Sequence, residues 1–200
     1  MYSAEKHRTK MQDVYQASII HRLAAKSIES LEVAQAMQNS LQESQQETER
    51  MQEARALVNR RLLSRGMRAV LTPGLGDCFF VALVETAGLP MSSFDLRQQV
   101  CEYLELNKEW FLPCFADASA LESHIQAMRS EGVWATAFEI TAASHLTLRP
   151  IHLITDHAED PHSTTVIEPP LIYAATAWQP TVYLAHFLQC HFEGTTAAEI

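Results

Sequence analysis

Glycine and proline are missing from the first third of this 200-residue chain, and no long hydrophobic run occurs anywhere in it. The first glycine is Gly66 and the first proline is Pro73. Because these two residue types interrupt helices, their absence predicts a helical arm over residues 1–66. The longest apolar run, residues 78–84, is too short to cross a bilayer, and the chain starts without the apolar stretch of a signal peptide. We therefore expect no contact with a membrane.

Basic residues are scarce after the arm. Residues 1–66 carry ten Lys or Arg and eight Asp or Glu, whereas residues 67–200 carry five and sixteen. Nucleic-acid binding needs clustered basic side chains, so the net charge of −9 argues against a nucleic-acid partner. The acidic part of the chain favours a basic partner, although an acidic surface also serves solubility alone.

Cysteine is also scarce, with four in the whole chain and no Cys-x-x-Cys pair. This excludes a disulfide scaffold, a zinc knuckle and a thioredoxin-type motif. Three histidines, His152, His157 and His162, recur every five residues, but this spacing fits no helix face and no cysteine stands near them. We expect no metal and no cofactor. Unpaired thiols suit a reducing compartment, so we expect the chain to work in a cytosol.

Apolar residues in the arm recur at three- and four-residue steps, first from Ile20 to Leu41 and again from Met51 to Leu62. The polar stretch between them is either a solvated helix or the bend of a helical hairpin. Two roles for the arm remain open. It either grips a partner or serves as a packing brace or an oligomerising coil.

Residues 67–200 form the second predicted domain. Helices are predicted from Cys78, Ser93, Ser119 and Ala137, and strands after Pro150. The expected strands cover residues 151–155, 165–167 and 181–188. Helices followed by strands predict a layered α/β (α+β) domain, in which helices pack around a small central sheet.

The stretch around Cys78 carries the clearest chemical signal, Gly-Leu-Gly-Asp-Cys-Phe-Phe over residues 74–80. A glycine-containing loop brings Cys78 to the first turn of a buried helix, where backbone N–H groups and the helix dipole stabilise a thiolate. The same N–H groups can form an oxyanion hole. Taken alone, the stretch also fits a buried structural cysteine, which is the commoner case.

A candidate base stands near the C-terminal end of the sequence, where His191 precedes Glu193 by two residues. Residues i and i+2 share a face of an extended backbone, so Glu193 can reach the imidazole and fix its tautomer. His186 is the alternative base, but no acidic residue follows it at i+2. The sequence therefore predicts Cys78 as nucleophile, His191 as base and Glu193 as the orienting carboxylate.

These residues resemble the motifs of the ovarian-tumour (OTU) family of deubiquitinating cysteine proteases. Residues 76–82 resemble its nucleophile motif, and His191-Phe192-Glu193 is similar to its His-aromatic-Asp/Asn ending. Residues 134–154 resemble its middle block, in which a tryptophan precedes a helix and then a strand. Three blocks in the family's order, over roughly residues 68–196, are more specific than one short motif.

The resemblance implies a papain-like fold, no cofactor, and thiol-dependent hydrolysis of isopeptide bonds at the C-terminus of ubiquitin. Ubiquitin or polyubiquitin chains are then the expected partner. Backbone amides near Asp77 and Cys78 would hold the oxyanion, so Asp77 is counted with the catalytic residues. Trp134 and Phe192 are expected to bind substrate.

Three positions depart from the family's pattern. Leu75 stands where the family has an aspartate, Ala135 replaces a glycine, and Glu193 replaces Asp or Asn. These departures keep open a ubiquitin-binding pseudoenzyme or an adaptor without turnover. The intact Cys/His pair favours an active enzyme. Such divergence is typical of a distant family member, for example a bacterial effector in the cytosol of a host cell.

Overall fold

The computed structural model forms two compact units, Met1–Arg50 and Met51–Ile200. It describes residues 33, 35–156, 164–170, 179–188 and 191–198. In the first unit, residues 35–50 are helical and exposed, in agreement with the predicted helix. The boundary between the two units falls after Arg50, whereas the sequence places the domain boundary after Gly66. The difference arises because the helical residues 51–63 pack against the sheet of the second unit.

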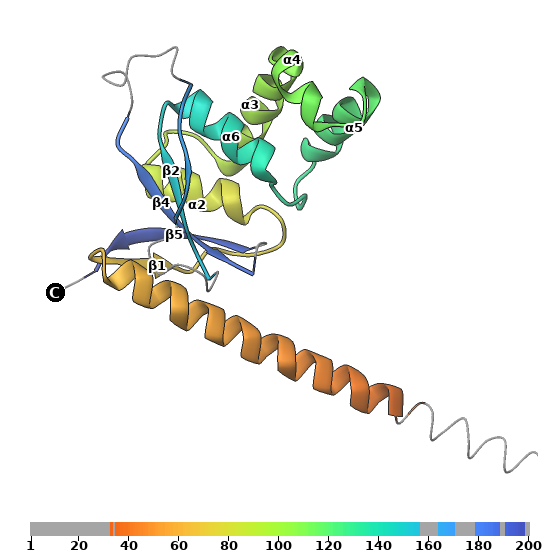
Figure 1. The fold of residues 1–200 in the computed structure, drawn as a ribbon, viewed down its shortest axis with the longest axis vertical. Coiled ribbons are helices and arrows are strands. Elements are labelled where there is room, and N and C mark those ends of the chain that lie inside the picture. Colours follow the sequence, from red (N-terminus) through yellow and green to blue (C-terminus); the bar gives the residue numbers. More distant parts are fainter. Residues whose placement is uncertain (1–32, 34, 157–163, 171–178, 189–190, 199–200) are drawn as a thin grey trace, which may run out of the picture. The chain divides into compact units, whose positions relative to one another are not determined.

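A mixed five-stranded sheet with the order β1-β5-β4-β2-β3 forms the centre of the second unit (Figure 1). Strands β2 and β4 pair in parallel, and the other neighbours are antiparallel. The strands are β1 (Met67–Val70), β2 (Ile151–Thr155), β3 (Thr164–Ile167), β4 (Val182–Phe187) and β5 (His191–Ala197). The three strands predicted after Pro150 are confirmed as β2, β3 and β4. The sequence does not predict β1, which is short, and of β5 it predicts only the extended backbone at residues 191–193, because Gly194 weakens the strand signal beyond them.

Apolar side chains point to both faces of this sheet. On β4, Leu184 belongs to the core on one face, whereas Ala185 and Phe187 belong to the core on the other. The second core is closed by the helical segment 51–63, which buries Ala54, Val58 and Leu62. These three residues recur at four-residue steps, as the apolar stripe of the arm predicts.

Helices cover the first face of the sheet, and α2 (Cys78–Ala87) packs directly on β4 and β5 (Figure 1). Next to it lies α3 (Ser93–Leu106), which in turn packs against α5 (Ala118–Met128) and α6 (Ala137–Thr147). The short α4 (Lys108–Phe111) and a 3₁₀ turn (Leu112–Cys114) connect α3 to α5. Capping boxes begin α3 at Ser92 and α6 at Thr136, close to the predicted starts. The predicted layered α/β fold is therefore confirmed.

Over the part of the chain that the structure describes, no helix combines the length and the hydropathy needed to cross a membrane.

Candidate active site

Cys78 is the first residue of α2, as the sequence predicts, and only 1% of it is exposed. Asp77 is the N-cap residue, but its side chain makes no capping hydrogen bond. It therefore does not compete for the N–H groups of the first turn, which lie at the positive end of the helix dipole and can stabilise an anion.

His191 begins β5, and its ring is shared between Cys78 and Glu193. Its Nε2 lies 3.5 Å from Oε1 of Glu193, and Cys78 is its other hydrogen-bonding partner. Hydrogen bonds with Cys78 and with Glu193 raise the pKa of His191 from 6.5 to about 9, because both partners favour the imidazolium. The predicted nucleophile, base and orienting carboxylate are thus brought together, and the shared face of His191 and Glu193 is confirmed.

Glu193 is fully buried, and Arg55 of the helical segment 51–63 binds its carboxylate through two hydrogen bonds. Nη1 donates to Oε2 at 3.1 Å, and Nη2 donates to Oε1 at 2.5 Å. Burial raises the pKa of Glu193, but hydrogen bonds from His191 and Arg55 outweigh this effect and leave the pKa below its ordinary value. Glu193 is therefore ionised at neutral pH, with a cation on each side.

The sequence does not predict the role of Arg55, because the whole arm lies outside the motifs that point to the site. A signal was nevertheless present. Arg55 follows Met51 by four residues and precedes Val58 by three, so it lies within the apolar stripe of the arm. A charged residue inside such a stripe needs a buried partner of opposite charge.

The carboxylate of Asp77 holds the cysteine loop through a buried arginine. Arg97 of α3, which is 0% exposed, donates to Oδ1 of Asp77 at 2.6 Å. It also donates to the carbonyls of Gly76 at 3.1 Å and Val133 at 2.9 Å. The second carboxylate oxygen accepts the N–H of Gly132 at 3.0 Å. Asp77 therefore ties two loops together, and its side chain supports the loop that carries Cys78.

Two glycines allow these loops to approach each other. Gly76 has a φ of +86°, and a Cβ at this position would lie 2.0 Å from the carbonyl oxygen of Gly132. Next to it, Leu75 also has a positive φ, of 73°, and is 86% exposed. An exposed leucine in this strained conformation occupies the position of the aspartate in the family's pattern.

The two predicted substrate-binding residues lie in different surroundings. Trp134 is 46% exposed and follows Val133, so the loop held by Arg97 presents it at the surface. Phe192 is 3% exposed, and its ring packs against Phe79 with centroids 5.4 Å apart. It reaches the site through its backbone N–H, which donates to Sγ of Cys78 at 3.5 Å. The ring of Phe192 is therefore part of the core.

His186, the alternative base, lies on β4 opposite Phe192 and stacks on that ring at 4.2 Å. His191 pairs with Phe187 instead, so the two histidines occupy alternate positions of the ladder and face opposite sides of the sheet. His191 is the better base because its ring interacts with both Cys78 and Glu193.

Among the described residues, no three His, Cys, Asp or Glu side chains are grouped closely enough to hold a metal ion. His157, His162 and Cys190 lie outside the described residues.

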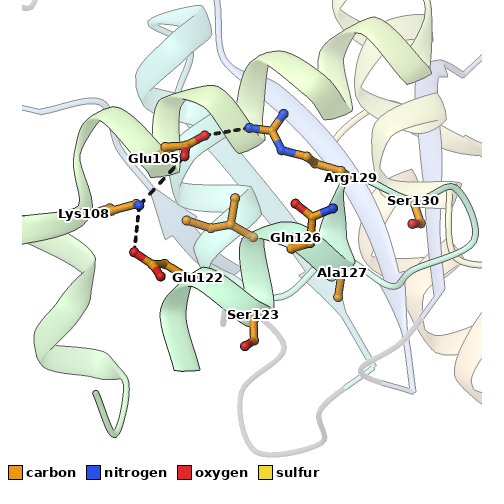
Figure 2. A pocket seen from close by; sticks show the side chains of 9 residues that line it. Glu105, Lys108, Glu122, Ser123, Gln126, Ala127, Arg129 and Ser130 are labelled. Atoms are coloured by element: carbon orange, nitrogen blue, oxygen red, sulfur yellow. Dashed lines mark hydrogen bonds and ion pairs between the residues drawn. The ribbon is translucent and has the colours of Figure 1, made fainter. Parts of the chain in front are cut away.

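A pocket of about 820 Å³ lies between the end of α3 and α5 (Figure 2). Its charged side chains pair with one another: Arg129 with Glu105 at 2.7 Å, and Lys108 with Glu122 at 3.3 Å. Neither Cys78 nor its partners line it, so this pocket is separate from the candidate active site.

Comparison with known proteins identifies a family. The model of the OTU-like cysteine protease family matches residues 73–192. No curated protein matches the sequence. Among solved structures, the chain is similar to the OTU domain of OTUD1, with 20% identity, a TM-score of 0.62, and coverage of 75% of this chain and 99% of that chain.

Two further structures share the fold. One is an OTU deubiquitinase from Wolbachia pipientis wMel bound to ubiquitin, with 15% identity, a TM-score of 0.52, and coverage of 66% of this chain and 97% of that chain. The other is an OTU domain in complex with ubiquitin, with 17% identity, a TM-score of 0.51, and coverage of 65% and 69%. Arg55 and Glu193 both lie outside the residues that the family model matches.

Proposed function

Since the chain belongs to the family of OTU-like cysteine proteases, we propose that it is a deubiquitinase. In this proposal Cys78 attacks the isopeptide bond at the C-terminus of ubiquitin. The observation that carries it is the hydrogen-bonded set of Cys78, His191 and Glu193. Ubiquitin as the substrate is supported by two of the similar domains, which are bound to ubiquitin.

The reaction begins with transfer of the thiol proton of Cys78 to His191. Because the pKa of His191 is raised, its imidazole is a stronger base toward this proton, and the thiolate that forms faces the imidazolium. The thiolate then attacks the carbonyl carbon of the last residue of ubiquitin, and the first-turn N–H groups of α2 hold the oxyanion. His191 returns its proton to the leaving lysine amine, and the amine departs. Water hydrolyses the thioester and restores Cys78.

Trp134 is proposed as a substrate contact because it is half exposed on the loop that Arg97 joins to Asp77. Leu75 stands on the other loop of this pair and is more exposed still. Two apolar groups beside the cysteine loop suit an extended peptide tail, and the acidic charge of residues 67–200 suits a basic one. A cytosolic site of action belongs to the same proposal, because a catalytic thiol must be kept reduced.

A ubiquitin probe with a cysteine-reactive group at its C-terminus tests this function. We expect the wild type to form a covalent adduct and Cys78→Ala to form none. Cys114→Ala is the matched control, because Cys114 is a free, exposed cysteine in the 3₁₀ turn after α4. It should react like the wild type. Failure of the folded wild type to form an adduct would contradict the proposal. Retained binding of unmodified ubiquitin in that case would identify a pseudoenzyme.

A further inference from the structure

We propose that Arg55 is a positioning residue of the active site, which fixes the carboxylate of Glu193 in front of His191. The two hydrogen bonds of 3.1 and 2.5 Å join residues that are 138 positions apart in the sequence. Arg55 can play this part only if Cys78 is the nucleophile of the proposed hydrolysis, on which the inference rests. The helical segment 51–63 then contributes to the reaction as well as to the core.

The length of the Glu193 side chain explains why a clamp is needed. Glutamate has one more methylene and one more rotatable bond than aspartate, so its carboxylate can occupy more positions and loses more conformational entropy when it is fixed. A bidentate guanidinium fixes both oxygens and the plane of the carboxylate. In this arrangement the same Oε1 that accepts from Arg55 lies 3.5 Å from Nε2 of His191.

Burial of Glu193 gives Arg55 a second task. An ionised carboxylate that is 0% exposed is costly unless a cation and hydrogen bonds compensate it. Without Arg55, we expect Glu193 either to take up a proton or to turn away, and both changes weaken its bond to His191. The groups that face the imidazole are Cys78 from α2, Glu193 from β5 and, through Glu193, Arg55.

The ring of Phe187 packs against the guanidinium of Arg55. Arg55 lies over its ring, 5.2 Å from the centroid, and the same ring stacks with His191 at 6.1 Å. The arginine, the carboxylate and the imidazole are therefore packed around one aromatic ring, which limits the movement of each. A salt bridge that only fastened the segment to the sheet would not need contact with the base.

Steady-state kinetics on a ubiquitin substrate separate a role of Arg55 in positioning Glu193 from a role in attaching the helical segment to the sheet. For Arg55→Ala we expect kcat to fall roughly 10- to 100-fold with little change in KM, as part of the contribution of general acid–base catalysis is lost. Arg55→Lys keeps the charge without the fork and should be intermediate. Arg60→Ala, an exposed arginine on the same segment, is the control and should behave like the wild type.

The pH dependence of kcat gives a second test. If Arg55 had a merely structural role, its removal would leave the midpoint of the alkaline limb unchanged. With Glu193 released, the midpoint set by His191 should move down from about 9 toward the ordinary 6.5. Wild-type kcat and an unchanged midpoint in folded Arg55→Ala would overturn the proposal.

A double mutant guards against a variant that does not fold. Glu193→Gln removes the buried charge, so Arg55→Ala in that background leaves no uncompensated ion. If Arg55 acts through Glu193, the second substitution should lower kcat by less than about twofold beyond the first. Two full, independent effects on kcat would contradict the proposal.

Alkylation of Cys78 by iodoacetamide, followed at that residue by mass spectrometry, separates the inference from the proposed function. The reaction needs no ubiquitin, and at neutral pH it should be slower in Arg55→Ala than in Arg60→Ala. If the wild type cleaves no ubiquitin substrate, the proposed function fails while slower alkylation still supports Arg55. Equal alkylation rates in the two variants would count against Arg55 whatever the substrate is.

Discussion

Residues 35–50 and residues 51–63 are both helical, but only the second stretch is buried against a sheet. In the first, Met37 is 71% exposed and Leu41 is 61% exposed, whereas Val58 and Leu62 in the second are fully buried. Both stretches carry apolar residues at helical spacing. The comparison teaches that an apolar stripe predicts a helix, while the burial of that stripe depends on a partner surface that the pattern does not contain.

The buried stretch also carries Arg55, which touches Glu193. The compact unit that holds the active site therefore begins well before residue 73, where the match to the family model starts. A boundary drawn from the family motifs alone would cut away part of the site's support.

Two truncations give the largest expected contrast. Removal of residues 1–66 should abolish stable folding and activity, because it exposes the second core and leaves the buried Glu193 without Arg55. Burial of each large apolar side chain is worth about 1.5–3 kcal/mol, against a total stability of about 5–15 kcal/mol. Removal of residues 1–50 should leave the melting temperature and kcat close to those of the full chain. Thermal unfolding and ubiquitin-substrate cleavage measure both.

The same pair of truncations decides between the two roles of the arm. Weaker ubiquitin binding after removal of residues 1–50 would support a recognition role for that stretch, and unchanged binding would exclude it. A fully active protein after removal of residues 1–66 would show that the helical segment 51–63 is dispensable, contrary to the expectation.

Single substitutions should reproduce the contrast on a smaller scale. Leu62→Ala removes a fully buried side chain, and we expect a loss of about 2–5 kcal/mol in the free energy of unfolding. Leu41→Ala changes an exposed position and should alter that free energy by less than about 0.5 kcal/mol. Urea denaturation of the two variants gives both values. Equal losses would show that Leu41 has a partner that stabilises it.

The parts of the site that sequence predicts are those fixed by local geometry. The helix start fixes Cys78, the two-residue period of a strand brings Glu193 to His191, and Thr136 caps its own helix. Arg55 and Arg97 could not be placed in this way. Their partners come from other elements, so only the packed fold brings the charges together.

The pH dependence of kcat should show the smallest effect of removing the exposed stretch, residues 35–50, from the chain. Hydrogen bonds with Cys78 and Glu193 raise the pKa of His191 to about 9, so the imidazolium persists at neutral pH and is lost as the pH rises through that value. The stability that the protonated imidazole adds to the fold is fully present below pH 6.5, the ordinary pKa, and is lost as the pH rises from there through about 9. We expect kcat to fall about tenfold per pH unit above the midpoint, because the leaving amine then lacks its proton donor. The full chain and the chain without residues 1–50 should share this midpoint, because the side chains that shift the pKa values of His191 and Glu193, among them Cys78 and Arg55, lie in the unit that starts at Met51. A midpoint that shifts on that truncation would mean that the exposed stretch also acts on the active site, and the distinction between the two halves of the arm would fail.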